Sequence, residues 1–183
     1  DKYLLEQVIK FKKEISVIAF MSKKGEVKCF EPSENIHKKG ILRESNFPAN
    51  INETCKRRAK KIAKTIVKAL DVIGLIAVEM FVCNDNEIIV NEIAPRPHNS
   101  GHWTLDVCNI SQFEALIRLI FNLPIKNIKY YHKCKMINLL GVNYSFVNQA
   151  ISKDNYKVYV YGKSKIEPSR KLGHINVLSK LNA

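Results

Sequence analysis

Residues 79–102, EMFVCNDNEIIVNEIAPRPHNSGH, constrain the fold of this chain more than any other stretch. Strand-like runs lie on both sides of Asp85-Asn86, and Asp and Asn tolerate the positive φ angles that a two-residue β-turn requires. The stretch therefore predicts a β-hairpin, followed by a loop that leaves its second strand.

The register of this hairpin brings two acidic residues together. The turn closes if Cys83 or Asn84 pairs with Glu87. Pairing outward from that point places Glu79 directly opposite Glu92. Like charges that face each other across a β-ladder are destabilising, so the arrangement favours a counter-ion, most simply a divalent cation accompanied by phosphate oxygens. The alternative is a pair of solvated carboxylates on an exposed face.

The loop after the hairpin gathers cationic and polar side chains close to Glu92. Two prolines bracket Arg96 and force the backbone into an extended, stiff path. A guanidinium held rigidly there presents a bidentate fork suited to a carboxylate, bicarbonate or phosphate. His98 and Asn99 add groups that can orient a small planar oxyanion. Each of them, and His102, is singly explained as a loop-stabilising side chain, but together they favour a catalytic loop.

Strand and helix patterns can be placed along most of the chain. Strands are predicted at residues 3–9, 15–20, 27–30, 136–140, 157–161 and 174–178. Residues 31–50 are polar and contain two prolines, so we expect an irregular loop there. Apolar residues at helical spacing predict a helix over 53–70, with a lysine-rich outer face. A second helix is predicted from the capping box Ser111-Gln112-Phe113-Glu114 to a point before Pro124.

These patterns indicate an α+β fold with a mostly antiparallel sheet. The spacing of strands and turns changes near residue 130, which predicts a small C-terminal β domain at 130–183 after a larger domain at 1–129. The chain starts without methionine and runs at once into an apolar stretch. We therefore expect it to be a fragment of a longer protein.

The composition limits the classes of partner. The net charge of +13 comes mainly from dispersed lysines, and no helix-turn-helix, zinc-finger or RNP pattern accompanies it. We interpret the excess as solvated surface with some attraction for anionic ligands, and keep a polyanion-binding or nucleic-acid-binding module as the alternative function. The five cysteines lack metal-ligand spacing, which indicates reduced thiols in a cytoplasmic protein. No apolar run is long enough to predict a membrane span.

The stretch VEMFVCNDNEIIVNEIAPRPHNSGHWT, followed by ISQFE and LPI, resembles the N5-carboxyaminoimidazole ribonucleotide synthetases, ATP-grasp enzymes of purine biosynthesis. The segments LEQVIKFKKEISVIA, ENIHKKGIL, MINLLG and YGKSKIEPSRKLGHIN match the same family in the same order. The resemblance covers nearly the whole chain. It implies the C-terminal subdomain of the ATP-grasp fold, followed by the small C-terminal β domain.

The resemblance also implies a set of site residues. The positions that match nucleotide contacts are Glu6, Gln7 and Val8 at the adenine, Glu14 at the ribose, and His37 and Asn91. The positions that match the two magnesium ligands are Glu79 and Glu92, and those that match the bicarbonate and carboxyphosphate loop are Arg96, His98 and Asn99. The positions that match the grip on the ribonucleotide phosphate are Lys163 and Arg170, with Lys171 and His174 continuing the motif.

The implied activity is the ATP-dependent carboxylation of 5-aminoimidazole ribonucleotide by bicarbonate. It requires ATP and Mg²⁺ or Mn²⁺, passes through carboxyphosphate and, in the family, is carried out by a homodimer. Another ATP-grasp carboxylate or formate ligase of purine synthesis is the alternative within the enzyme class. The family's N-terminal Rossmann-like domain and its phosphate-holding lysine have no counterpart in these residues. We therefore expect the isolated chain to be inactive or very weakly active.

Overall fold

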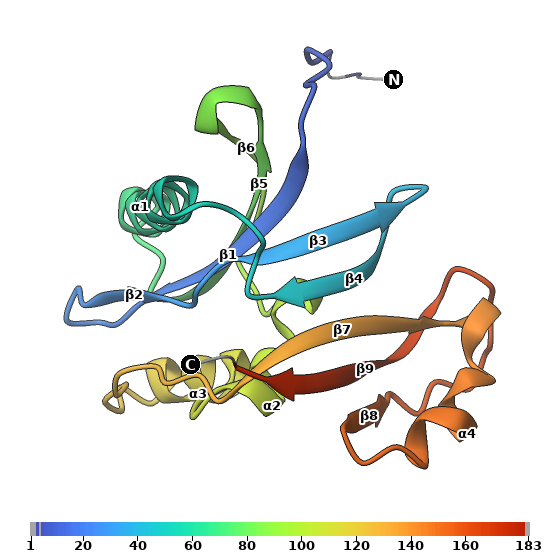
Figure 1. Cartoon of the computed structure of the whole chain (residues 1–183). Helices are drawn as coiled ribbons and strands as arrows, with labels where there is room; N and C mark the ends of the chain where they lie inside the picture. Colours follow the sequence, from blue (N-terminus) through green and yellow to red (C-terminus); the bar gives the residue numbers. More distant parts are fainter. Residues whose placement is uncertain (1–2, 4, 182–183) are drawn as a thin grey trace.

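The computed structural model describes residues 3 and 5–181, and its strands form one antiparallel sheet (Figure 1). The strand order is β6-β5-β1-β3-β4-β7-β9-β8, and β2 pairs with the end of β1. The strands are β1 (Lys13–Met21), β2 (Val27–Cys29), β3 (Ser33–Lys38), β4 (Ile41–Phe47), β5 (Gly74–Val82), β6 (Ile88–Ala94), β7 (His132–Leu140), β8 (Tyr156–Val160) and β9 (Lys171–Lys180). The predicted α+β class is confirmed.

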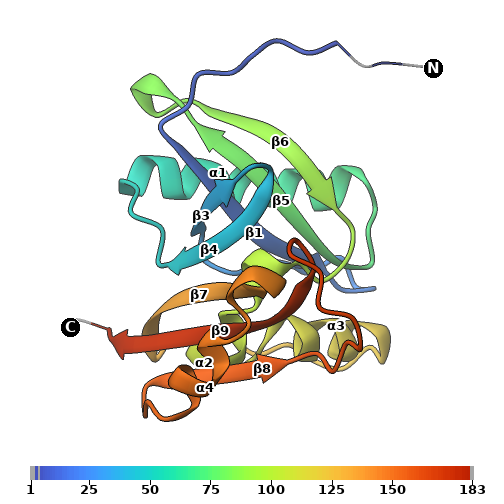
Figure 2. The same ribbon diagram turned by 90° about the vertical axis from the view of Figure 1, so that its right-hand side faces the viewer.

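Helices cover both faces of this sheet. The α-helices are α1 (Glu53–Ala69), α2 (Thr104–Val107), α3 (Gln112–Ile120) and α4 (Phe146–Ile151). The 3₁₀ helices are η1 (Asn84–Asn86), η2 (Asn99–Gly101) and η3 (Gly141–Asn143). Figure 2 shows α1 beside β1, β5 and β6 in the upper half of the molecule, and α2, α3 and α4 in the lower half. Helix α2 packs on β7 and β9, α3 packs on β5 and β1, and α4 packs on β8. Across the described residues, no helix is long and apolar enough to cross a membrane.

Helix α1 follows directly from its sequence. Asn52 caps the helix, because its side chain accepts a hydrogen bond from the Cys55 N–H. Ala59, Ala63 and Val67 recur at four-residue spacing and are completely buried against β1 and β5. The helix predicted over residues 53–70 is confirmed, with its lysines on the outer face.

The other face of the sheet has an aromatic core. Trp103, which is 1% exposed, stacks on Phe47 with ring centroids 3.9 Å apart. Phe30 meets the edge of Trp103, and Tyr130 stacks on Phe47. Offset and edge-on aromatic contacts of this kind add to the free energy gained by burial. They fix the segment that follows β6 onto the sheet, and that segment carries the candidate site.

The turn of the central hairpin has the predicted conformation. Asp85 and Asn86 adopt φ angles of 54° and 62°, in the left-handed region that Asp and Asn tolerate best. The backbone N–H of Cys83 donates to the carbonyl of Glu87 and closes the turn. The hairpin of β5 and β6 predicted from the sequence is therefore confirmed.

Two predictions about the first fifty residues are wrong. Residues 3–9 do not form a strand: Leu4 lies outside the described residues, and Leu5 and Val8 are 98% and 87% exposed. The segment predicted as an irregular loop at 31–50 instead contains β3 and β4. Polar residues form these strands because they satisfy one another inside the sheet; for example, the hydroxyl of Ser45 donates to Asn35 Oδ1 at 2.8 Å.

The C-terminal strands lie where the sequence predicts them, as β7, β8 and β9. Strand β7 also pairs with β4, from Glu44 with Ile137 to Phe47 with Cys134. The sheet is therefore continuous across the boundary expected near residue 130. The division into domains at 1–129 and 130–183 remains a prediction. Helix α4, between β7 and β8, was not predicted.

Candidate active site

Glu79 and Glu92 face each other across β5 and β6, as the hairpin pattern predicts. The turn alone does not produce this register. From Val82 opposite Ile88, the pairing shifts by one residue at a β-bulge between Met80 and Glu79, and only this shift brings Glu92 opposite Glu79. Bulges re-aim side chains and are frequent beside active sites.

Glu79 has an environment that suits a cation ligand. Its side chain is 12% exposed, and Oε1 is buried without a hydrogen-bond partner among the described residues. Burial raises the pKa of this carboxyl, and the Glu92 and Glu14 carboxylates raise it further, whereas His37 and Lys171 lower it. A buried, orphaned carboxylate oxygen beside a second carboxylate fits a divalent cation.

The ligand set available from the protein is small. The described residues contain no group of three or more His, Cys, Asp or Glu side chains placed to hold a metal. Mg²⁺ typically takes one or two carboxylates and completes its octahedron with water and phosphate oxygens. The pair Glu79 and Glu92 fits that pattern, and does not fit a site built from protein ligands alone.

Arg96 lies in the loop that follows β6 and Glu92. It is exposed, and its guanidinium donates to the Pro97 carbonyl at 3.1 Å. Burial lowers the pKa of the Lys171 ammonium, Arg96 and Lys163 lower it further, and Glu79 opposes them. Lys171 is thus electrostatically coupled to Glu79 and to the two cations Arg96 and Lys163, and such a group of positive charges can attract an anion.

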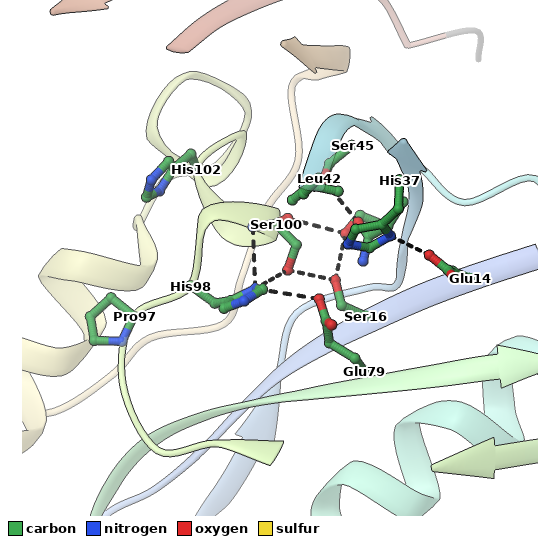
Figure 3. A network of polar contacts seen from close by, with 12 residues as sticks. Glu14, Ser16, His37, Leu42, Ser45, Glu79, Pro97, His98, Ser100 and His102 are labelled. Carbon is green, nitrogen blue, oxygen red and sulfur yellow. Dashed lines mark hydrogen bonds and ion pairs between the residues drawn. The ribbon is translucent and has the colours of Figure 1, made fainter. Parts of the chain in front are cut away.

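His98 lies deeper in the same loop. It is 9% exposed, and Figure 3 shows its ring directed toward Ser100 and Glu79. Burial, with smaller contributions from Arg96 and Lys171, lowers the pKa of His98 to about 4, so the imidazole is neutral at pH 7. The 3.7 Å contact between His98 Nδ1 and Glu79 Oε1 is therefore not an ion pair.

Gln112 clamps this loop from beneath. It is completely buried; its Oε1 accepts from the His98 N–H at 3.0 Å, and its Nε2 donates to the His98 carbonyl at 2.7 Å. Its Nε2 also lies 3.1 Å from His102 Nδ1. A Cβ on Gly101 would lie 2.8 Å from Gln112 Oε1, so only glycine fits at that position without displacement. The sequence identified Gln112 only as part of a capping box.

Three buried serines hold the loop on the sheet. They are Ser16 of β1, Ser33 of β3 and Ser100 of η2. Ser16 donates to Ser100 Oγ at 2.8 Å (Figure 3). Ser33 donates to the Ser100 carbonyl at 3.2 Å. No motif in the sequence points to these serines, although a serine inside the apolar run of residues 15–20 is an available signal.

The nucleotide residues suggested by the resemblance fall into two groups. Glu14 contacts His37 Nδ1 across β1 and β3, and Figure 3 shows the pair close to Glu79. Glu6, Gln7 and Asn91 line one open hollow of about 380 Å³ beside the hairpin. Val8 is not among the residues that line it.

The residues that the resemblance suggests for binding the ribonucleotide phosphate differ in exposure. Lys163 and Arg170 lie on the loop between β8 and β9; Lys163 is exposed, and its Nζ donates to the Lys171 carbonyl at 2.7 Å. His174 is only 2% exposed, and its part in binding the phosphate remains a prediction. Its ring stacks on Tyr159 with centroids 4.5 Å apart. The geometry makes it a core residue beneath the site.

The lysine-rich face of α1 shows a more ordinary arrangement. Lys60 forms an ion pair with Glu31, and Lys56 pairs with Glu53 at 2.8 Å. The first pair is partly buried, and the second is an exposed pair of a kind that contributes little stability. The face remains open to anions, but it lacks the aromatic side chains that single-stranded nucleic-acid sites use.

Two family models match the chain in succession. The ATP-grasp domain matches residues 1–113, and the phosphoribosylaminoimidazole carboxylase C-terminal domain matches residues 134–183. The N5-carboxyaminoimidazole ribonucleotide synthase of Bacillus subtilis is 41% identical over 97% of this chain and 47% of its own length. The phosphoribosylaminoimidazole carboxylase of Saccharomyces cerevisiae is 37% identical over 92% of this chain and 31% of its own length.

Solved structures agree with these matches. An N5-carboxyaminoimidazole ribonucleotide synthetase in complex with ADP superposes with a TM-score of 0.92 at 42% identity, over 95% of this chain and 46% of that one. The Aspergillus clavatus enzyme, in complex with ADP and 5-aminoimidazole ribonucleotide, gives a TM-score of 0.89 at 34% identity, over 93% of this chain and 47% of that one. The chain thus spans between about a third and a half of the length of these proteins.

Proposed function

The chain belongs to the ATP-grasp family, and we propose that it supplies the magnesium, bicarbonate and phosphate-binding half of an N5-carboxyaminoimidazole ribonucleotide synthase. One observation carries the proposal: the bulge-dependent pairing of Glu79 with Glu92, beside a loop that presents Arg96 and His98. A pair of carboxylates that can hold a cation, next to a positively charged loop that can bind an oxyanion, suits the transfer of a phosphoryl group to bicarbonate.

The proposed reaction joins three substrates. A bicarbonate oxygen attacks the γ-phosphorus of ATP, the bond to the β-phosphate oxygen breaks, and ADP leaves with carboxyphosphate formed. Carboxyphosphate separates into phosphate and carbon dioxide. The exocyclic amine of 5-aminoimidazole ribonucleotide then attacks the carbon and loses a proton, giving the N5-carbamate. Magnesium, when bound, neutralises charge on the phosphate oxygens.

The residues of this chain have separate tasks in that scheme. Glu79 and Glu92 hold the cation, which accounts for a buried Glu79 Oε1 that has no hydrogen-bond partner within the part of the chain that the structure describes. Arg96 orients bicarbonate through its exposed guanidinium, with Asn99 beside it. Lys163, Arg170 and Lys171 bind the phosphate of the ribonucleotide. Holding the reactants in contact and away from water is the main contribution such a site makes.

The nucleotide itself binds on the hairpin side. Glu14 accepts hydrogen bonds from the ribose hydroxyls, with His37 fixing its orientation. Glu6, Gln7 and Asn91 surround the adenine in the open hollow that they line. Val8 stays at the margin of this group.

We also propose that the intact enzyme is a cytoplasmic homodimer. Support for a reducing compartment comes from the five cysteines, all of which are free thiols. Support for a subunit contact comes from α3, where Ile117 and Ile120 are more than half exposed. Analytical ultracentrifugation of the intact enzyme, with Ile117→Glu as the disrupting variant, tests the dimer.

The function is tested by joining this chain to the part of a relative that it does not match. The part of the Bacillus subtilis relative that precedes the matched region is fused to this chain, and ADP release is followed with ATP, bicarbonate and 5-aminoimidazole ribonucleotide. We expect release to need all three substrates, and Glu79→Gln to lower kcat by at least about 100-fold. Glu87→Gln, an exposed carboxylate in the same hairpin, is the matched control. ADP release that ignores bicarbonate would refute the proposal.

The same assay separates the alternatives. A panel of other purine intermediates bearing an amine tests for a different ATP-grasp ligase. A polyanion-binding module would instead show affinity for nucleic acid that falls steeply with salt, and it would depend on the lysines of α1 rather than on Glu79.

A further inference from the structure

The buried serines beneath the catalytic loop form a directed chain of hydrogen bonds that ends on His98. Ser16 and Ser33 are 1% exposed and Ser100 is completely buried, and they come from β1, β3 and η2. Ser16 Oγ lies 3.1 Å from Ser33 Oγ and 2.8 Å from Ser100 Oγ. Ser100 Oγ in turn lies 2.8 Å from His98 Nδ1 (Figure 3).

The number of hydroxyl hydrogens decides which group donates in each hydrogen bond of this serine network. Each hydroxyl carries one hydrogen and accepts through its lone pairs. Ser16 uses its hydrogen on Ser100 Oγ, and Ser33 has the Ser100 carbonyl as an acceptor. Because Ser100 Oγ already accepts from Ser16, its own hydrogen is left for His98 Nδ1. The chain therefore delivers a donor to that nitrogen.

A second donor meets the same nitrogen. The backbone N–H of Ser100 points at His98 Nδ1 from 3.4 Å, in the manner of a helix N-cap for η2. Two donors converging on one ring nitrogen require it to be the unprotonated one. In a neutral imidazole the proton then sits on Nε2, for which the described residues provide no acceptor.

The competing arrangement places a proton on Nδ1 and directs it at Glu79. The distance from His98 Nδ1 to Glu79 Oε1 is 3.7 Å, beyond the range of a hydrogen bond, whereas the distance to Ser100 Oγ is 2.8 Å. A proton on Nδ1 would also leave the Ser100 hydroxyl without an acceptor inside a buried network. The hydrogen bond from the Ser100 hydroxyl to His98 Nδ1 is therefore favoured over one from His98 Nδ1 to Glu79. Glu79 Oε1 then has no hydrogen-bond partner among the described residues.

We propose that Ser16, Ser33 and Ser100 are positioning residues that lock His98 as the Nε2–H tautomer, so that His98 donates a hydrogen bond to a substrate oxyanion and does not act as a general base. Only the identity of that oxyanion, bicarbonate or carboxyphosphate, rests on the proposed function. A fixed donor suits an oxyanion whose charge grows during reaction, because it needs no reorganisation.

The tautomer is measured directly on the 183-residue chain. Nitrogen-15 spectra of the histidine rings at pH 7 distinguish a protonated from an unprotonated Nδ1, and the His98→Asn variant identifies the His98 signals. We expect an unprotonated Nδ1 in the wild type and, in Ser100→Ala, a shift of the tautomer ratio by about fivefold or more toward Nδ1–H. Ser16→Ala should shift the ratio less, because Ser100 keeps its hydroxyl.

Ser45→Ala is the matched control. Ser45 is also completely buried in the sheet, but its hydroxyl donates to Asn35 Oδ1 and is not part of the chain to His98. A loss of packing alone would affect both serine sites, whereas the tautomer signal should change only for Ser100 and Ser16. A wild-type spectrum with a protonated Nδ1 overturns the proposal, and this outcome does not depend on the folding of any variant.

The proposal and the proposed function can fail separately. If the fused enzyme lacks the carboxylation activity but Nδ1 is unprotonated, the function is wrong and the serine chain stands. If the enzyme is active but Nδ1 is protonated, the serine chain is wrong.

Discussion

Replacing Glu79 by glutamine should stabilise the chain when no metal is present. Glu79 faces Glu92 across the ladder, which costs about 0.2–1 kcal/mol for like charges. Its Oε1 is also buried without a hydrogen-bond partner among the described residues, which costs about 1–3 kcal/mol. Burial raises the pKa of Glu79, so folding favours its neutral form and is opposed by the charge at pH 7. Glutamine has the same shape as glutamate and still buries an unpaired polar group, so only part of these costs is removed. We expect the free energy of unfolding to rise by about 1 kcal/mol.

The assay is thermal unfolding in EDTA and again with Mg²⁺ and ATP. For a chain of this size, a gain of about 1 kcal/mol raises Tm by about 2–4 °C. Glu87→Gln, an exposed change in the same hairpin, should stay within about 0.5 kcal/mol of the wild type. At ligand concentrations about tenfold above Kd, the wild type should gain about 1.4 kcal/mol, and Glu79→Gln should gain almost nothing.

Two results would refute this reasoning. A loss of stability in EDTA larger than about 1 kcal/mol for Glu79→Gln would mean that the carboxylate makes favourable contacts in the free chain. Equal stabilisation of both proteins by Mg²⁺ and ATP would place the cation elsewhere. Either result separates the structural argument from the family resemblance.

Three further changes test the loop and the core beneath it. Gln112→Ala removes the clamp on both sides of the His98 peptide and should cost about 2–4 kcal/mol in urea unfolding; a cost below 1 kcal/mol would contradict the clamp. Gly101→Ala places a Cβ 2.8 Å from Gln112 Oε1 and should cost about 1–3 kcal/mol, less when combined with Gln112→Ala; strict additivity would argue against the contact. Burial lowers the pKa of His174 to about 3. Below pH 6.5 the unfolded chain therefore binds a proton at this residue that the folded chain does not bind, so the free energy of unfolding decreases as the pH falls from 6.5 toward 4. His174→Phe should flatten that dependence by up to about 1.4 kcal/mol per pH unit in unfolding titrations, and an unchanged slope would show that His174 is not buried in its neutral form.

Local signals in the sequence placed the elements with regular patterns. Helix α1 combines apolar spacing with an Asn52 cap, and the hairpin turn uses residues that accept left-handed φ angles. Strands β3 and β4 lack such a pattern. Their buried faces carry Ser33, Asn35 and Ser45, which find partners only once the sheet is assembled, so their polarity suggested a loop.

In the candidate site, too, some residues could be predicted from a contiguous motif and others could not. The sequence selected Arg96 and His98 because the proline-bracketed loop is contiguous. It did not select Gln112, and it did not show that His174 lies in the core. The structure shows Gln112 holding the loop and His174 buried beneath it. The contacts that decide both roles join residues far apart in the chain, which no short pattern contains.

Turn chemistry and strand alternation act over a few neighbouring residues, so the hairpin and the cationic loop could be predicted from the sequence, with Glu79 and Glu92 near each other across the two strands. The tertiary structure decided what makes those residues a site. A bulge sets the final register of Glu92, burial leaves Glu79 Oε1 without a partner among the described residues, and serines from two other strands direct a hydrogen bond to His98. Those outcomes depend on how distant strands pack, because burial and hydrogen-bond partners exist only in the folded sheet.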